Sequence, residues 1–497
     1  MTIGTLLLNI GIVAVVLTAL MVFVFKNHKN ILTSFLQNFC GALFIFSGWV
    51  KAVDPLGTAY KMEQYFDEFY STFSETWISF IAPVFPLFSK YAIWFSVFMI
   101  IFEIVLGVML IIGAKRKFTA WAFFLLVAFF TVLTGFTFLT GYVPADANFF
   151  EFGSWAAYDK NNMKVTDCGC FGDFIKLEPK VSFYKDVFLL IPSIYFLYKW
   201  ESKHQLFSEK VRGLISGVTT GLLIAYCMNN YVFDLPKMDF RPFKRGADIR
   251  ATRLAEEDAA ASVQILSWKL KNKSDGKIVE VPNEVYMKTF QTDYPRDSWE
   301  VVEQVMTKPS IEATKISEME FEDVNEGYDV TFDILDGKGP SFMVVCYKLD
   351  ADVSIEKQTI QDTTYNVDTV AVEGFADSLL LVKSINQITP KEISVYNYDW
   401  DKDYIDNFKG KILPLSKAAI NDNIPFRVMI GGADTDMIKA LEQEVGFEGV
   451  QFCKADDILL KTIVRSNPGV VLWNNGKIID KWHIRRLPNY ETIKNKF

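Results

Sequence analysis

Six apolar stretches within the first 232 residues set the strongest limit on what this chain can fold into. A helix needs about 20 apolar residues to cross the hydrocarbon layer of a membrane. The stretches are Ile3–Phe25, Ile31–Val50, Tyr91–Gly113, Phe118–Tyr142, Phe183–Tyr198, which is the shortest, and Val211–Val232. Because so many occur in one half of the chain, we expect a membrane bundle of about six helices rather than the buried helices of a soluble core.

Basic residues between these stretches predict the orientation, because Lys and Arg concentrate in cytoplasmic loops. They follow the first, third and fifth stretches, as Lys26, His28 and Lys29, as Lys115, Arg116 and Lys117, and as Lys199, Lys203, Lys210 and Arg212. We therefore expect an inner (cytoplasmic) membrane protein with both termini and everything after Asp234 in the periplasm. Residues 1–30 are either an extra transmembrane helix, which we favour, or a signal peptide, which would have a basic start and a small-residue cleavage site.

The second half of the chain, from about Leu235 to Phe497, is polar and carries most of the net charge of −8. That charge is typical of a solvated region and argues against a nucleic-acid binder. Its length permits two units, a β-rich unit at 235–355 and a second unit at 378–497, with the boundary in 356–377. In the first unit, alternating apolar residues predict strands at Ala261–Lys269, Tyr328–Ile334 and Ser341–Lys348.

Strands alternate with helices in the second unit. We predict strands at Leu379–Ser384, Phe426–Gly431, Val450–Phe452, Gly469–Trp473 and Lys477–Trp482, and helices at Leu413–Ile420, Asp434–Glu444 and Asp456–Val464. Asn474-Asn475-Gly476 is a hairpin signal. This order is typical of a thioredoxin-like fold. Pro468 stands where that fold has its cis-proline, which is a partner-binding position. The alternative is that Asn467-Pro468 forms a turn with a trans peptide bond. Where a working thioredoxin has Cys-x-x-Cys, we expect Ile385–Pro390, which cannot perform dithiol chemistry.

Two of the six cysteines, Cys168 and Cys170, are close together, in an outward loop where disulfides persist. A Cys-Gly-Cys disulfide closes a very small ring, which would make it strained and comparatively oxidising. A redox-active pair is therefore our catalytic candidate. Two alternatives stay open: structural disulfides to other cysteines, of which Cys227 lies near the same membrane face, and a metal site, which lacks nearby histidines. Cys40 lies in the second stretch, and Cys346 and Cys453 read as small buried hydrophobes.

Charged residues at the membrane form a second group. Lys51 and Asp54 end the second stretch on one helix face, and Glu103 lies in the middle of the third, where a carboxylate normally faces the bundle interior. A Lys51–Glu103 pair would be structural or would serve proton or quinone chemistry, although Lys51 is expected near the surface and Glu103 near the middle. Lys185 and Asp186 are expected to be interfacial caps.

These residues together carry a resemblance to a family. Gly41–Lys61 with Phe46-Ser47-Gly48, the Glu103-x-x-x-Gly107 pattern, and Asp167–Asp173 followed by Ser182–Asp186 resemble the DoxX/MauE superfamily over about residues 31–230. With its appended outer domain, the chain is similar to the DoxX family of Bacteroidetes-type bacteria. Phe240–Phe243 and Ile463–Gly469 extend this likeness to the outer domain.

The resemblance implies a four-helix core within 31–232 and a role in disulfide formation or maturation of periplasmic proteins. It also implies electron transfer between thiols, here Cys168 and Cys170, and membrane quinone. One departure matters, because MauE-like bundles usually travel with a separate thioredoxin-like partner that has cysteines, and the appended unit here lacks them.

Two functions remain. In the first, Cys168 and Cys170 cycle between dithiol and disulfide and exchange with a periplasmic thiol protein, while the thioredoxin-like unit presents clients. In the second, the protein is a non-catalytic scaffold whose outer part binds an envelope protein. A transporter is less favoured, because Glu103 is the one clearly central acid.

Overall fold

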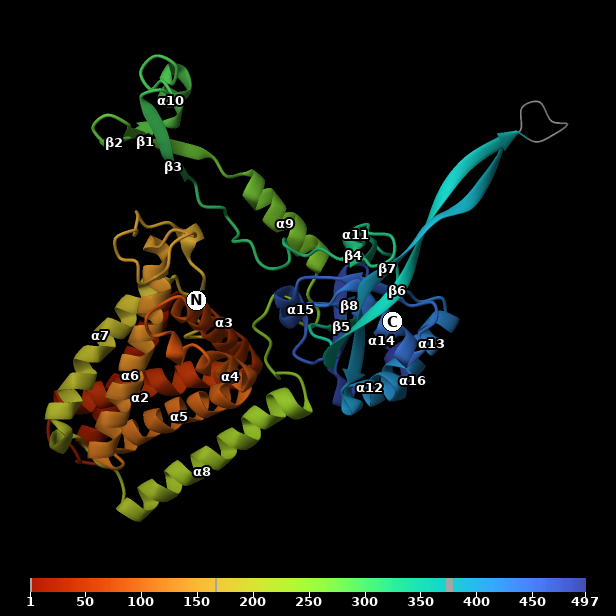
Figure 1. Ribbon diagram of the computed structural model, residues 1–497. Coiled ribbons are helices and arrows are strands. Elements are labelled where there is room, and N and C mark those ends of the chain that lie inside the picture. Colours follow the sequence, from red (N-terminus) through yellow and green to blue (C-terminus); the bar gives the residue numbers. More distant parts are fainter. Residues whose placement is uncertain (1, 166–167, 372–378) are drawn as a thin grey trace.

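The computed structural model describes residues 2–165, 168–371 and 379–497. It contains a helical bundle at the N-terminal end, followed by a strand-rich region that packs against one end of the bundle (Figure 1). The helices of the bundle are α1 (Ile3–Ala19), α2 (Ile31–Val53), α3 (Pro55–Ser74), α4 (Val84–Lys90), α5 (Ala92–Ile112), α6 (Arg116–Leu139), α7 (Pro179–Tyr198) and α8 (Glu209–Met228).

Within the described residues, six helices are long and apolar enough to cross a membrane. They run over Ile3–Val24, Ile31–Val53, Ala92–Ile112, Arg116–Tyr142, Pro179–Tyr198 and Glu209–Phe233, which confirms all six expected spans. The segment between the second and third spans is itself helical, since it forms α3 and α4. Asp54 makes the corner between α2 and α3, where its side chain accepts a hydrogen bond from the Gly57 amide and so caps α3.

Helices α2 and α5 cross closely because glycines lie at their contact. A Cβ atom on Gly48 would lie 2.4 Å from Cγ1 of Ile104, so a larger residue there would force Ile104 to shift. Helix α8, by contrast, lies along the side of the bundle (Figure 1), and Gly217 in it has no atom within 4 Å of a Cβ position. The close packing is therefore concentrated in the interior helices.

The strand-rich region contains β1 (Ile265–Asn272), β2 (Ile278–Pro282), β3 (Trp299–Met306), β4 (Glu322–Asp323), β5 (Pro340–Cys346), β6 (Ala351–Ala371), β7 (Leu379–Trp400), β8 (Phe426–Ile430), β9 (Gln451–Lys454), β10 (Gly469–Asn474) and β11 (Lys477–His483). Its helices are α9 (Ile249–Ala261), α10 (Asn283–Thr289), α11 (Thr331–Leu335), α12 (Lys402–Asn407), α13 (Leu413–Asn421), α14 (Thr435–Val445), α15 (Asp457–Ile463) and α16 (Tyr490–Lys494).

One six-stranded sheet, in the order β11-β10-β5-β8-β9-β4, organises the C-terminal part; with its helices we name it the sheet unit. Strands β5, β8 and β9 are parallel, and β10 and β11 form the antiparallel hairpin that Asn474-Asn475-Gly476 predicts. Strand β5 belongs to the expected first unit, yet it lies at the centre of this sheet. The expected boundary at 356–377 therefore does not separate two sheets; its described part lies in the β6–β7 hairpin, and 372–377 lie outside the described residues.

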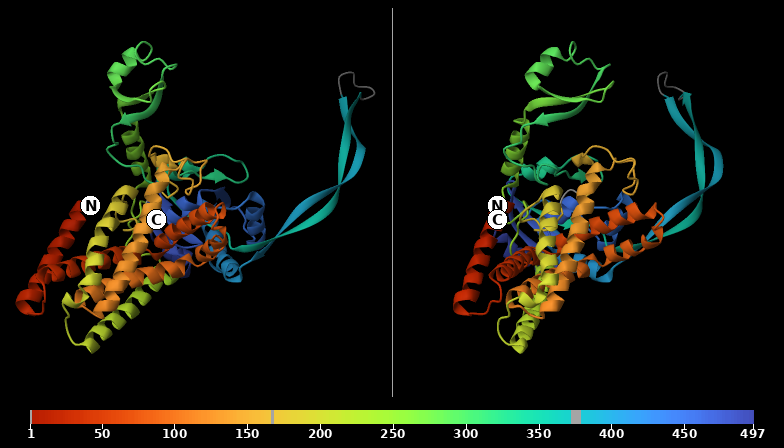
Figure 2. Two further views of the ribbon diagram at one scale, coloured as in Figure 1. Left: turned by 60° about the vertical axis from the view of Figure 1, so that its left-hand side comes forward. Right: turned by 90° about the vertical axis from the view of Figure 1, so that its left-hand side faces the viewer.

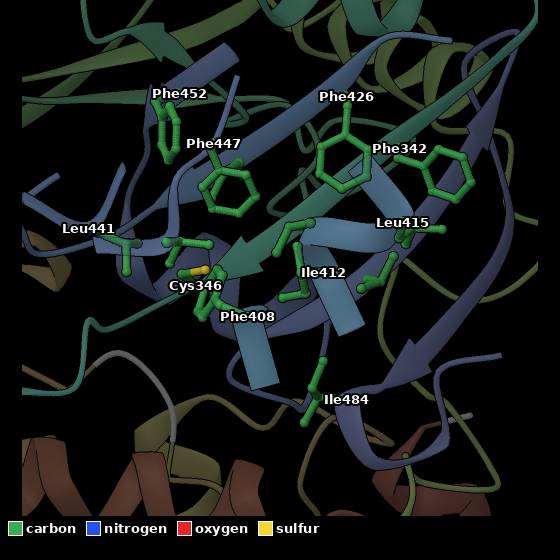
Figure 3. Packing of buried hydrophobic residues seen from close by; sticks show 14 of the residues in the cluster. Phe342, Cys346, Phe408, Ile412, Leu415, Phe426, Leu441, Phe447, Phe452 and Ile484 are labelled. Atoms are coloured by element: carbon green, nitrogen blue, oxygen red, sulfur yellow. The ribbon is translucent and has the colours of Figure 1, made fainter. Parts of the chain in front are cut away.

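Buried side chains cover both faces of the sheet. On one face, Cys346 at the end of β5 lies among Phe408, Ile412 and Leu441, with its sulfur in the apolar interior (Figure 3). Burial raises the pKa of the Cys346 thiol to about 12, so this cysteine is an inert core residue, as expected. Cys453, on β9, is buried in the apolar cluster of the opposite face.

Two expected local structures differ from those observed. Tyr328–Ile334 is expected to be a strand, but α11 occupies most of it. Ile385–Pro390 is expected at a strand-to-helix junction, but it lies within β7 and pairs with β6. The junction that leads from the central strand into a helix instead runs from Cys346 to Lys402, interrupted by the β6–β7 hairpin. Helical and alternating patterns in short segments are ambiguous until long-range pairing is known.

Two appendages project from the sheet unit. The β6–β7 hairpin extends away from it, and the small sheet β2-β1-β3 with α10 stands at the far end of α9 (Figures 1 and 2). An aromatic contact between Trp268 and Tyr286, with ring centroids 4.7 Å apart, holds α10 on the small sheet. Neither appendage contributes strands to the six-stranded sheet.

Candidate functional site

A buried ion pair lies in the interior of the bundle. Nζ of Lys51, on α2, lies 2.7 Å from Oε2 of Glu103, on α5, and both residues are less than a tenth exposed. The Lys51 ammonium also lies 4.9 Å from the ring centroid of Phe130. Two charges in an apolar interior are retained only when each compensates the other. The structure thus brings together Lys51 and Glu103, which their expected depths would have kept apart.

A second buried ion pair lies at the start of α7. Nζ of Lys185 lies 2.6 Å from Oδ1 of Asp186, whose residue is 2% exposed. Oδ2 of Asp186 accepts a hydrogen bond of 3.0 Å from the Thr134 hydroxyl on α6. Interfacial caps would be exposed to solvent, so the expectation for Lys185 and Asp186 is wrong. They are part of the bundle interior.

The cysteine loop, residues 168–175, packs onto this end of the bundle; Asp167 of the expected motif lies outside the described residues. The Ser47 hydroxyl on α2 donates a hydrogen bond of 2.9 Å to the Cys170 carbonyl. Gly169 has a φ of +61°, in the left-handed region that glycine adopts readily, so the chain turns sharply between the two cysteines. Phe171 is 1% exposed and packs against Phe46.

One cavity connects these groups. Its walls include both ion pairs, Cys168, Cys170 and Lys61, and its remaining lining is mostly apolar, with Leu43, Phe44, Met62, Met99, Ile100, Leu133 and Leu189. The volume of this cavity is about 70 Å³. Two thiols and two ion pairs therefore share one apolar space at the end of the bundle that faces the sheet unit.

Burial raises the pKa of the Cys170 thiol, an effect that the nearby Lys185 ammonium opposes. Asp186 and Glu103 also raise it, and Lys51 lowers it. Since the thiolate is the reactive form, Cys170 is expected to be slow to attack unless its surroundings change.

The other predicted site residues lie elsewhere. Asp54 faces Arg465 of the sheet unit, at 2.8 Å, rather than Lys51 and Glu103. Cys227 is a free thiol buried among Ala52, Ile100 and other residues of a separate cluster. The Asn467–Pro468 peptide is cis, as expected. Within the described residues, no group of three or more His, Cys, Asp or Glu is placed to hold a metal ion.

Sequence reasoning missed Thr134, Asp173 and Arg465. Threonine in an apolar helix is common and gave no signal, and Arg465 lies more than 400 residues from its partner Asp54. Arg465 lies within Ile463–Gly469 and Asp173 ends Asp167–Asp173, two stretches that carry the family resemblance, but neither residue was assigned a role.

Comparison with known families supports the assignment of the bundle. Residues 29–145 match the family model described as methylamine utilisation protein MauE, about a quarter of the chain. The chain matches no curated protein and no solved structure. Together with the six apolar helices, the match indicates a multi-pass membrane protein. The chain is thus similar to MauE over a segment that supplies Lys51 and Glu103 of the site but neither of the two cysteines of the loop.

Proposed function

We propose that this protein is a membrane thiol-disulfide oxidoreductase that acts in the maturation of periplasmic proteins, with Cys168 and Cys170 as its redox pair. The observation that carries the proposal is the position of both cysteines in the wall of a cavity that also contains two buried ion pairs. A loop held only by a structural disulfide has no need of such a cavity. In support, the positive-inside pattern of the loops favours a position of the cysteines on the oxidising side.

In the proposed reaction, a thiolate of a reduced client attacks the Cys168–Cys170 disulfide and forms a mixed disulfide. A second client thiolate then displaces the protein's sulfur. The client leaves with a new disulfide, and Cys168 and Cys170 are left as two thiols. The two electrons and two protons that their reoxidation releases must go to an acceptor.

A membrane quinone that approaches the cavity from the bilayer is the proposed acceptor, because the walls are largely apolar and the Lys51 and Lys185 side chains are hydrogen-bond donors within them. A quinone takes up two electrons and two protons, which balances the oxidation of the thiol pair. The protein's part is to hold the thiols at the cavity and to position the Lys51 and Lys185 side chains through their ion pairs with Glu103 and Asp186.

The sheet unit is proposed to be thioredoxin-like. In support, a central strand β5, helices α12 and α13, the parallel strands β8 and β9, and the hairpin β10–β11 after a cis-proline follow in the order expected for that fold. The place of the catalytic cysteines, after β5, holds Tyr347-Lys348-Leu349. The sheet unit then serves to present or exclude partners rather than to exchange disulfides.

The proposal is tested by trapping. A Cys170→Ser variant keeps Cys168, and because disulfide exchange is reversible the Cys168 thiolate attacks the disulfide of an oxidised client. Without Cys170 to resolve it, we expect the mixed disulfide with that periplasmic protein to accumulate and to be preserved when thiols are blocked in intact cells. Cys227→Ser is the matched control, because that thiol is buried within the bundle, and it should trap nothing. A permanently oxidised pair with no trapped partner, and unchanged client oxidation in the Cys168→Ser variant, would rule the function out.

A second candidate, an envelope scaffold, rests on the β6–β7 hairpin. Exposed apolar residues gather on one face of its ribbon: Val353, Ile355, Tyr365, Ile385, Ile388 and Tyr396. An apolar ribbon face in solvent is a docking surface for another protein. This candidate predicts that Ile355→Ser with Tyr396→Ser abolishes function while Cys168→Ser does not; the redox function predicts the opposite.

A further inference from the structure

Arg465 of the sheet unit joins two parts of the bundle that border the cysteine site. Its Nε donates to both carboxylate oxygens of Asp54, at 3.1 and 2.8 Å, and its Nη2 lies 3.4 Å from Oδ2 of Asp173. A further bond runs from Nη1 to the carbonyl of Lys461. Arg465 is only 4% exposed, so these partners account for a fully buried guanidinium.

Aromatic and charged groups surround this contact. The Arg465 guanidinium lies 5.2 Å from the ring centroid of Tyr60, on α3, and that ring packs against Tyr347 of the sheet unit at 5.7 Å. Nζ of Lys461 lies 3.9 Å from Oε2 of Glu63. The contact is therefore a packed, ion-paired interface between the sheet unit and α3.

The two carboxylates that Arg465 binds lie next to the redox site in the sequence. Asp54 follows Lys51 by three residues and forms the corner between α2 and α3, and Asp173 follows Cys170 by three residues. The Arg465 guanidinium thus connects the cysteine loop, through Asp173, to the corner between α2 and α3, through Asp54. Helix α2 carries Lys51, which lines the cavity. Because Gly57 lies at the same corner, a Cβ atom there would lie only 2.9 Å from Nη2 of Arg465.

We infer that Arg465 is a positioning residue for the redox pair, through which the sheet unit holds Cys168 and Cys170 at the cavity although it has no redox cysteines of its own. This inference rests on the proposed function. It gives a sheet unit without Cys-x-x-Cys a role in the reaction. Arginine suits the role because its planar fork binds two carboxylates at once, which a lysine ammonium does less well.

Loss of this anchor should release the cysteine loop from its buried setting. The charged groups that face Cys170 across the cavity are Lys51 from α2, Lys61 from α3, Glu103 from α5, and Lys185 and Asp186 from α7. Burial is the main reason that the Cys170 pKa is raised. In a released loop the pKa of the Cys170 thiol is therefore closer to the ordinary value for a thiol, so alkylation of Cys170 begins at lower pH.

The test measures alkylation of Cys168 and Cys170 by a maleimide, read by peptide mass spectrometry, in the full-length protein in lipid nanodiscs between pH 6 and 10. In Arg465→Met we expect alkylation at pH 8 to rise on the order of 10-fold, as for a segment that passes from closed to open. The inflection in the plot of alkylation against pH should move to lower pH. Arg465→Lys should recover part of the wild-type profile. Gly57→Ala, which disturbs the guanidinium without removing a charge, should act in the same direction.

Arg427→Met is the matched control, because Arg427 bonds Gln451 within the sheet unit. Limited proteolysis of the sheet unit, unchanged in every variant, shows that the fold is intact. An Arg465→Met profile that coincides with those of wild type and Arg427→Met overturns the inference. Failure of the function is distinct, because then Cys170→Ser traps no partner even though the alkylation profile of Arg465→Met has moved.

Discussion

Gly41 and Gly107 face each other so closely that a Cβ atom on Gly107 would lie 2.7 Å from the Gly41 carbonyl oxygen. The approach is reciprocal, since a Cβ atom on Gly41 would lie 2.8 Å from the Gly107 carbonyl oxygen. Backbone atoms cannot move aside as a flexible side chain can. This contact sets the separation of α2 and α5, and so the reach between Lys51 and Glu103.

Gly107→Ala is expected to destabilise the bundle by about 1 to 3 kcal/mol, because an added methyl group overpacks a backbone contact. Thermal unfolding in detergent measures the effect. Gly217→Ala on α8 is the control, since nothing lies within 4 Å of its Cβ position, and it should be neutral. Equal melting temperatures for the two variants would contradict the close crossing.

Glu103→Gln should be more harmful than replacement of the whole ion pair. The single substitution leaves a buried Lys51 ammonium without its carboxylate, at a cost of about 3 to 5 kcal/mol. The double variant Lys51→Met with Glu103→Met removes both charges and should recover much of the lost stability. A double variant no more stable than Glu103→Gln, measured by thermal unfolding in the same detergent, would show that the pair is not a coupled unit.

Asp239→Asn should destabilise the sheet unit. Asp239 accepts from Arg241 at 2.8 Å and from the buried Lys481 at 2.6 Å. Burial opposes its ionisation, yet these two cations outweigh burial and lower its pKa well below the usual range. Without the carboxylate, both cations are left uncompensated, which costs about 3 to 5 kcal/mol in urea unfolding.

The control for that prediction is Asp422→Asn, which removes an exposed pair with Lys494. Exposed pairs are screened by water and contribute little. Similar losses of stability in the two variants would mean that burial of the Asp239 cluster adds nothing to the sheet unit.

Acid should weaken the sheet unit through His483. Burial lowers its pKa to about 4, and Arg485 acts in the same direction, whereas the unfolded residue titrates near 6.5. Above pH 6.5 both states are neutral and His483 has no effect. As the pH falls from 6.5 to 4, the unfolded state gains the proton first, so stability decreases by about 3 kcal/mol.

Urea unfolding followed by tryptophan fluorescence, at pH 7.5 and pH 4.5, measures this loss. His483→Gln, which does not titrate, should lose less stability than wild type over the same interval. If both lose the same amount, other groups are responsible for the acid sensitivity.

Much of the fold could be predicted from the sequence because its signals are local. The six spans follow from the length of each apolar stretch, and the β10–β11 hairpin follows from Asn475 and Gly476, whose φ angles of +51° and +71° suit a tight turn. The cysteines were found by their spacing alone. No long-range contact is needed for any of these features.

The amino-acid sequence by itself determined which segments cross the membrane and where two thiols lie close together. Only the tertiary structure decided which distant residues meet: β5 enters the sheet of the C-terminal unit, and Arg465 reaches Asp54. Depth along a helix did not predict the Lys51–Glu103 pair, because helices tilt and a lysine stem is long enough to lie along an apolar wall. Such partners are fixed by how the elements pack, and packing depends on the whole chain at once.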